Sequence, residues 1–126
     1  MRFFITVFLM LFASVASGDD HMLKESAYAQ VKQSIGKGKP YFLEVGSDSC
    51  HSCKVMSQML YEARQKHPGY NISFINVKKE RDAASELHVM MIPTQIIYDG
   101  NGKEVYRHIG VLSEDELAAL FTTYMF

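Results

Sequence analysis

Helix-like and strand-like segments alternate along this chain of 126 residues, and their order restricts the fold more than any other feature. Segments rich in β-branched, aliphatic and aromatic residues predict strands over 41–45, 71–77, 94–98 and 103–109. Apolar spacing and capping residues predict helices over about 19–35, 50–67 and 80–87, and after residue 113. This order predicts one α/β domain, with a mixed sheet of about four strands and helices on both of its faces.

Local signals mark where several of these elements begin and end. We expect Asp19 or Asp20 to cap the first helix at its amino end. The turn over 99–102 is rich in Gly and Asn, which predicts that the last two strands form a hairpin. Ser113 and Glu116 have the spacing of a capping box for the final helix.

Residues 1–18 have the pattern of a secretory signal peptide. A positive residue, an apolar run over 3–13 and a stretch of small residues follow one another in that order. The run is much shorter than the roughly 20 apolar residues that span a bilayer, although a retained anchor stays open as an alternative. We expect cleavage after Ala16 or Gly18, which leaves residues 19–126 as the folded domain. The protein is then periplasmic or otherwise secreted.

Composition excludes several other classes of protein. The chain has 13 Lys and Arg residues against 14 Asp and Glu residues, a net charge of -1, so nothing favours a nucleic acid or an anionic membrane surface as partner. A hydrophobic content of 48% is too high for a disordered chain. We expect no nucleic-acid partner, no cofactor and a monomer.

Cys50 and Cys53 are the only cysteines, and they flank His51 and Ser52. A pair this close closes too small a loop to stabilise the fold much as a disulfide. At the start of a helix, the free backbone N–H groups and the helix dipole lower the pKa of the first thiol. Its thiolate is the species that attacks a disulfide, and a second thiol one turn later can resolve the product. The pattern therefore predicts a redox-active dithiol with Cys50 as nucleophile and Cys53 as resolving residue.

A metal site is the alternative interpretation, because zinc and haem sites also use Cys-x-x-Cys. Haem attachment requires His after the second cysteine, where Lys54 stands. Zinc requires two more ligands, for which His51 and His67 are the candidates. His51 lies between the cysteines and His67 at the far end of the predicted helix, so we expect no metal.

At this point the chain resembles the thioredoxin superfamily over nearly all of residues 19–126. The matching features are the strand 41–45, the Cys-x-x-Cys helix followed by Lys54, Ile92-Pro93-Thr94, the turn Asp99–Gly102, and Gly110 before the last helix. The resemblance implies the thioredoxin fold and a cis peptide bond between Ile92 and Pro93 that faces the dithiol. It further implies that Met91, Ile92 and Pro93 bind an extended substrate by β-pairing. In the alternative interpretation, Pro93 merely begins a strand.

Glu44 lies six residues before Cys50, where thioredoxins place a buried acid. In an apolar strand the pKa of this carboxyl rises, and its carboxylate can accept the proton of Cys53 during resolution. The alternative is a glutamate on the surface or on an edge strand. Alternation along the strand does not decide between the two.

Three further features have two interpretations each. His51 as a cation stabilises the neighbouring thiolate and makes the pair more oxidising, or it is simply solvated. Met90 and Met91 form an adaptable apolar rim for polypeptides, or they pack inside the domain. His21, His88 and His108 have no evident partner, so a surface or core role is expected for them.

The chain also departs from the family pattern. Ser49 replaces the usual Trp before the first cysteine, and His51-Ser52 replaces Gly-Pro. The lysine that commonly partners the buried acid is missing, and Phe74 stands at the matching position. These departures leave the redox potential and the partner reductase open.

The resemblance implies an exported thiol:disulfide oxidoreductase, and we expect a reductase of disulfide-containing proteins that a membrane thiol reductase recharges. Ile92 resembles the reducing members, whereas His51 favours oxidants. A disulfide oxidase or isomerase is the alternative within enzymes. A Cys-based metal-binding chaperone and a non-catalytic adaptor are the alternatives from other classes.

Overall fold

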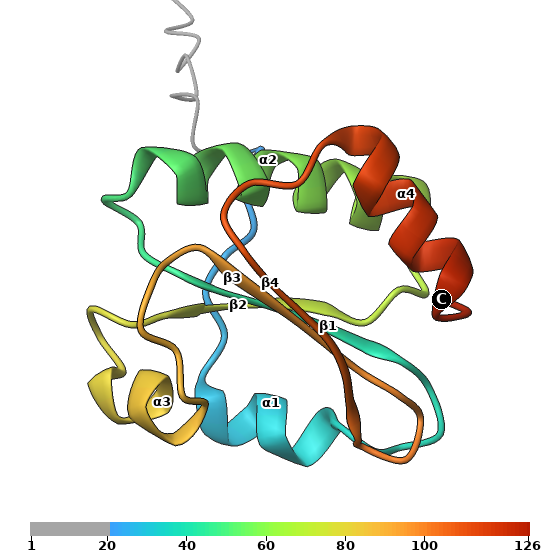
Figure 1. The fold of residues 1–126 in the computed structure, drawn as a ribbon, viewed down its shortest axis with the longest axis horizontal. Helices are drawn as coiled ribbons and strands as arrows, with labels where there is room; N and C mark the ends of the chain where they lie inside the picture. The colour runs from blue at the N-terminus through green and yellow to red at the C-terminus, as the bar shows by residue number, and fades with distance from the viewer. Residues whose placement is uncertain (1–20) are drawn as a thin grey trace, which may run out of the picture.

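The computed structural model describes residues 21–126, in which four strands form one mixed sheet (Figure 1). The strands are β1 (Tyr41–Gly46), β2 (Ile72–Asn76), β3 (Thr94–Tyr98) and β4 (Glu104–Ile109). The helices are α1 (Tyr28–Ser34), α2 (His51–Lys66), α3 (Arg81–Glu86) and α4 (Glu114–Thr123). The predicted order of elements is confirmed. The predicted signal peptide, residues 1–18, lies outside the described residues.

The strands lie in the order β2-β1-β3-β4. The central strand β1 pairs in parallel with β2 and antiparallel with β3, and β3 pairs antiparallel with β4. All six residues of β1 are buried, which explains why this strand is nearly continuously apolar. The edge strand β4 instead contains only exposed and half-buried residues.

Two helices cover each face of the sheet (Figure 1). α2 and α4 lie on one face and α1 and α3 on the other. The core beneath α2 and α4 is built from aromatic and aliphatic residues, among them Phe42, Met56, Leu60, Ile97, Leu117 and Phe121. The core beneath α1 and α3 is smaller and includes Val31, Leu43, Val45, Ile75 and Ile96.

The prediction for the first helix was wrong at its amino end. α1 begins at Tyr28, its N-cap is Ala27, and residues 21–27 are not helical. The backbone N–H of Leu23 donates to the Ser57 hydroxyl of α2, and that of Ser26 donates to the Phe74 carbonyl of β2. These bonds to distant elements replace the bonds that a helix would form within the segment.

The predicted capping box and hairpin are both present. Ser113 accepts from the Glu116 backbone N–H, and the Glu116 carboxylate accepts from the Ser113 N–H. In the hairpin turn, the Asp99 carboxylate accepts from the N–H groups of Asn101 and Lys103. No helix within residues 21–126 is both long and apolar enough to cross a membrane.

Candidate active site

Cys50 is the N-cap residue of α2 and is half-buried. Its Sγ accepts a hydrogen bond from the Cys53 backbone N–H at 3.3 Å, and the Ser52 hydroxyl lies 3.3 Å from the same sulfur. Burial alone raises the pKa of the Cys50 thiol. The hydrogen bonds from Cys53 and Ser52 outweigh that effect, so the pKa is lowered overall. Cys50 is therefore the cysteine that carries negative charge more readily.

Cys53 lies in the first turn of α2, and its side chain is buried. Burial, together with the hydrogen bond that its thiol donates to Cys50, raises the pKa of Cys53 to about 12, although a backbone hydrogen bond from Ser47 partly offsets this. Both cysteines are free thiols. In this reduced state the proton stays on Cys53 while the negative charge forms on Cys50.

Gly46 makes room for the buried thiol. A Cβ at this position would lie 3.0 Å from the Cys53 Sγ and 3.2 Å from the Cys53 Cβ. Both distances are tighter than nine in ten such contacts in proteins, so with a side chain here Cys53 would have to shift by a few tenths of an ångström. The last residue of β1 is thus matched to the first turn of α2.

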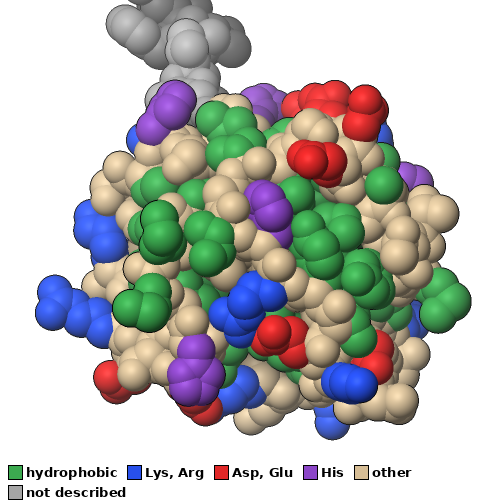
Figure 2. All heavy atoms as spheres, viewed as in Figure 1, with side chains coloured by type: hydrophobic (Ala, Val, Ile, Leu, Met, Phe, Trp, Pro, Cys, Tyr) green, Lys and Arg blue, Asp and Glu red, His purple; other side chains and the backbone are tan. Residues whose placement is uncertain are grey.

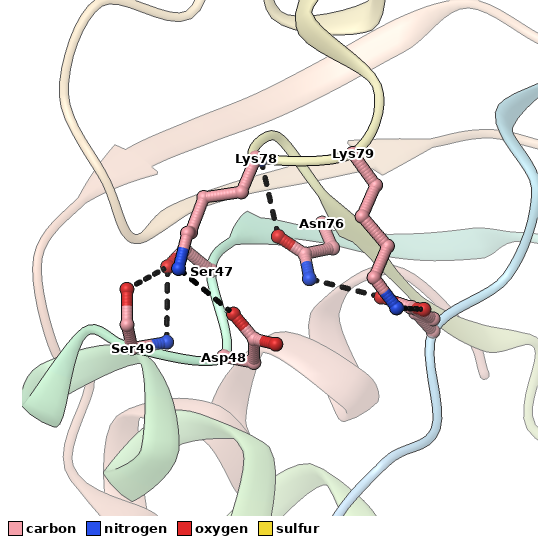
Figure 3. Close-up of polar contacts among 7 residues, drawn as sticks. Ser47, Asp48, Ser49, Asn76, Lys78 and Lys79 are labelled. Carbon is pink, nitrogen blue, oxygen red and sulfur yellow. Dashed lines mark hydrogen bonds and ion pairs between the residues drawn. The ribbon is translucent and has the colours of Figure 1, made fainter.

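Polar contacts hold the loop between Gly46 and Cys50 (Figure 3). The Ser47 hydroxyl accepts from the Ser49 backbone N–H at 3.1 Å and lies 3.0 Å from the Ser49 hydroxyl. Lys78 forms an ion pair of 3.7 Å with Asp48. Both charged groups are more than half exposed, so this pair contributes little to stability.

Asn76, at the end of β2, connects this loop region to the segment before α1 (Figure 3). Its side-chain oxygen accepts from the Lys78 backbone N–H at 3.1 Å, and its amide nitrogen donates to Glu25 at 2.9 Å. Glu25 also pairs with Lys79. Residues 21–27, which were predicted as part of the first helix, thus instead support the end of the sheet near the dithiol.

Glu44 is almost fully buried, with 1% of its surface exposed, so the predicted surface alternative is wrong. Burial raises the pKa of its carboxyl well above the ordinary value, and a hydrogen bond from Gln95 partly opposes this. The Gln95 side-chain nitrogen lies 3.4 and 3.3 Å from the two carboxylate oxygens. Repulsion between Glu44 and each of the two cysteine sulfurs contributes to the pKa of the groups involved, so the acid and the dithiol act on one another.

Gln95 and His108 are polar residues of this region that the sequence analysis missed. Gln95 is fully buried, and its side-chain oxygen lies 2.7 Å from Nδ1 of His108 on β4. The sequence identified no partner for His108, and the structure supplies one in Gln95. The available signal was the hairpin itself, because its register places Gln95 opposite His108.

The segment before β3 contains the predicted substrate-binding residues. The Ile92–Pro93 peptide bond is cis, which is the isomer that the resemblance implied. Thr94 pairs with Val45, so Pro93 lies beside the Gly46 end of β1. Met91 is 62% exposed and Met90 is 96% exposed, so neither methionine packs inside the domain.

Figure 2 shows hydrophobic side chains gathered over the start of α2 and the connection from α3 to β3. Besides the two methionines, the exposed hydrophobic residues include Ile109 and Val111, which flank Gly110. The Gly110 backbone N–H donates to the Pro93 carbonyl at 2.8 Å, so the end of β4 lies directly beside the cis-proline. The exposed apolar residues therefore lie on both sides of this proline.

The histidines that were considered as metal ligands lie apart. His51 is exposed at the first position of α2, whereas His67 stacks on Tyr70 just after its last position. A helix of 16 residues is about 24 Å long, so these two side chains cannot share one ion with the cysteines. Within residues 21–126, no three His, Cys, Asp or Glu side chains are grouped so that they could hold a metal.

Comparisons with known proteins agree with this geometry. The sequence model of a thioredoxin-like domain family matches residues 27–124. A thioredoxin from Alicyclobacillus acidocaldarius subsp. acidocaldarius is 28% identical over 92 residues, which are 72% of this chain and 87% of that protein.

Solved thioredoxins have the same architecture. The Fasciola hepatica protein superposes with a TM-score of 0.69 at 22% identity, covering 77% of this chain and 93% of that one. Malassezia sympodialis thioredoxin gives a TM-score of 0.69 at 21% identity, covering 80% and 88%. These likenesses confirm the predicted thioredoxin fold.

Proposed function

Since this chain belongs to the thioredoxin-like domain family and is in general terms a thiol:disulfide oxidoreductase, we propose that it is an exported reductase of protein disulfides. The observation that carries the proposal is the contrast between the two thiols of α2. Cys50 is accessible and its pKa is lowered, whereas Cys53 is buried and its pKa is raised to about 12. The Cys50 sulfur is thus suited to attack a substrate disulfide, and the Cys53 sulfur is suited to stay protonated until the mixed disulfide has formed.

The reaction proceeds in two exchanges. The Cys50 thiolate attacks one sulfur of a substrate disulfide, which forms a mixed disulfide and releases the other substrate sulfur as a thiolate that takes up a proton. Cys53 then gives its proton to Glu44 and attacks the Cys50 sulfur. The bond between Cys50 and the substrate breaks, the substrate sulfur leaves as a thiolate that takes up a proton, and Cys50 and Cys53 are left joined as a disulfide. The substrate has gained two electrons and the protein has lost two.

The substrate lies against the segment of Met91, Ile92 and Pro93. The exposed methionines offer an apolar surface that adapts to different polypeptides, and the backbone before Pro93 offers groups for β-pairing. The protein works as a monomer in this proposal, because one copy of the site suffices for both exchanges.

Export rests on the amino-terminal pattern of residues 1–18, which is typical of a signal peptide. Its removal leaves residues 19–126 in the periplasm or another secreted location. A reductase in an oxidising compartment needs a source of electrons, so a membrane thiol reductase reduces the Cys50–Cys53 disulfide back to the dithiol.

His51 bears on the direction of electron flow. It is exposed beside Cys50, and as a cation it would stabilise the thiolate and shift the pair towards an oxidant. A disulfide oxidase or isomerase is therefore the alternative function. The reduction potential separates the two, because a value near about −270 mV is that of a thioredoxin and one near about −120 mV is that of a strong oxidant.

The direct test uses two single variants in insulin reduction. We expect Cys50→Ser to abolish turnover, and Cys53→Ser to accumulate mixed disulfides that mass spectrometry detects. Full multiple turnover by Cys53→Ser would contradict the resolving role. Stoichiometric metal that survives dialysis, together with no thiol-dependent insulin reduction, would favour a metal-binding chaperone instead.

A further inference from the structure

A row of four residues crosses the whole sheet at the level of the buried acid. Glu44 of β1 pairs with Phe74 of β2 on one side and with Gln95 of β3 on the other, and Gln95 pairs with His108 of β4. Residues paired across a sheet point to the same face, which here is the face that α2 and α4 cover. The acid beneath the dithiol is thus linked by side chains to the edge of the sheet.

When Glu44 is ionised, the donor and acceptor of each hydrogen bond along this row are fixed. A carboxylate only accepts, so the Gln95 amide must turn its N–H₂ group to Glu44, at 3.3 and 3.4 Å. Its oxygen then faces Nδ1 of His108 at 2.7 Å, and that nitrogen must carry a proton. The orientation of Gln95 therefore depends on His108 at one end and on Glu44 at the other.

Glu44 needs such support because its surroundings disfavour its charge. It is 1% exposed, and its neighbour on β2 is the apolar Phe74. In the described part of the chain, Gln95 is the only side chain that donates a hydrogen bond to it. An acid that stays protonated cannot take the proton of Cys53, so whatever favours the carboxylate also favours resolution.

We propose that Gln95 and His108 are positioning residues for the buried acid, and that a protonated His108 strengthens the carboxylate form of Glu44 through Gln95. The proposal rests on the role of Glu44 in the proposed function. A histidine is neutral or cationic near physiological pH, and the cation polarises the Gln95 amide, so that its N–H₂ group donates more strongly to Glu44. His108 thereby acts in place of a lysine, which the chain lacks at Phe74.

Charged groups act on both ends of the row. At the Glu44 end this is the sulfur of Cys50, whose negative charge disfavours the carboxylate. At the other end is Glu116 in the first turn of α4, which interacts electrostatically with His108. The pKa of the Glu116 carboxyl is lowered chiefly by its hydrogen bonds with Ser113, and His108 adds a smaller electrostatic contribution in the same direction.

The test follows the Glu44 side-chain carboxyl carbon by NMR through a pH titration of the reduced protein. In Gln95→Leu the donor is lost, so we expect the Glu44 midpoint to move to higher pH. In His108→Gln a donor to Gln95 is retained but the charge is lost, so a smaller shift in the same direction is expected. The matched control is His67→Gln, which replaces an exposed histidine remote from the row and leaves the midpoint unchanged.

A second measurement reads the same shift in kinetics. Release of substrate from the Cys50 mixed disulfide should slow by about tenfold near neutral pH in Gln95→Leu, and its rising pH limb should move to higher pH in both variants. A Glu44 titration in His108→Gln that superimposes on the unsubstituted protein would overturn the proposal, even if Gln95→Leu fails to fold. Failure of the proposed function is a distinct result, because the unsubstituted protein would then reduce no disulfide while the titration still reports on the row.

Discussion

The outer and inner halves of the dithiol site differ although each contains one cysteine of the same helical turn. The outer half holds Cys50 and His51, which solvent reaches, and the loop before them, in which Asp48 and Lys78 form an exposed ion pair. The inner half holds Cys53 and Glu44, both buried between β1 and α2. The same thiol group has a lowered pKa in the outer half and a pKa raised to about 12 in the inner half.

This difference shows that position relative to solvent and to hydrogen-bond donors, and not residue type, sets the pKa of each thiol. Cys50 ends a loop, so it receives hydrogen bonds while it remains accessible. Cys53 is one turn further along, where the helix turns it into the core. A spacing of three residues is therefore enough to lower the pKa of one thiol and raise that of the other.

The largest expected effect is in thiol alkylation of the two single-cysteine variants. At pH 7 we expect iodoacetamide to modify Cys50 in Cys53→Ser at least about a hundredfold faster than Cys53 in Cys50→Ser. The second variant lacks the two contributions of the Cys50 sulfur to the high pKa of Cys53, but burial, the largest cause, remains. In denaturant both variants should react at the same rate. Equal rates in the folded proteins would remove the distinction between the two halves.

The next effect concerns how tightly the inner half is packed. We expect Gly46→Ala to lower the free energy of unfolding by about 1–3 kcal/mol, because its Cβ would meet Cys53 at 3.0 Å. Urea unfolding of the reduced protein measures this. The matched control is Gly69→Ala, where a Cβ meets nothing within 4 Å, so no loss is expected. Equal stability of the two variants would mean that the inner half can accommodate a Cβ at position 46 without loss of packing.

A smaller effect follows from the raised pKa of Glu44. The folded state holds the carboxyl proton more tightly than the unfolded state does. The contribution of this proton to the free energy of unfolding is therefore fully present at low pH. It is lost as pH rises from the ordinary carboxyl pKa through the raised one, by at most about 1.4 kcal/mol per pH unit. Glu44→Gln should remove this slope and be the more stable protein above that window. Urea unfolding at several pH values measures both, and parallel pH profiles would contradict burial as the cause.

The smallest effect is expected in the outer half. Asp48→Asn removes the exposed ion pair with Lys78, and we expect the free energy of unfolding to change by less than about 0.5 kcal/mol. Thermal unfolding at low and at high salt measures this. A clearly larger loss would show that the loop before Cys50 depends on this pair, and the two halves would then be more alike than the structure indicates.

Prediction from sequence succeeded where the signal was local. The capping box of Ser113 and Glu116 and the turn at Asp99 involve residues within four positions of one another, and both are present. The first helix was predicted to begin too early. Leu23 and Tyr28 are not at a helical spacing, and the segment before Tyr28 forms its hydrogen bonds with α2 and β2 instead. No local pattern reveals partners that far away.

The residues of the site show the same contrast between local signals, which allowed prediction, and distant contacts, which did not. The place of Cys50 at the start of α2 was predicted from its neighbours, and the structure confirms it. The direction of Glu44 was not decided, because every residue of β1 is buried and alternation therefore carries no information. His108 was given no partner, because its contact depends on the pairing of β3 with β4.

The amino-acid sequence by itself determined the order of helices and strands and the placing of two thiols one turn apart, since both follow from residues close together in the chain. Only the tertiary structure decided which thiol is buried, that Glu44 lies in the core, and that Gln95 lies against it although 51 positions separate the two. The physical reason is that burial and strand register are set by packing between distant segments. Those contacts also decide the pKa values on which the chemistry depends.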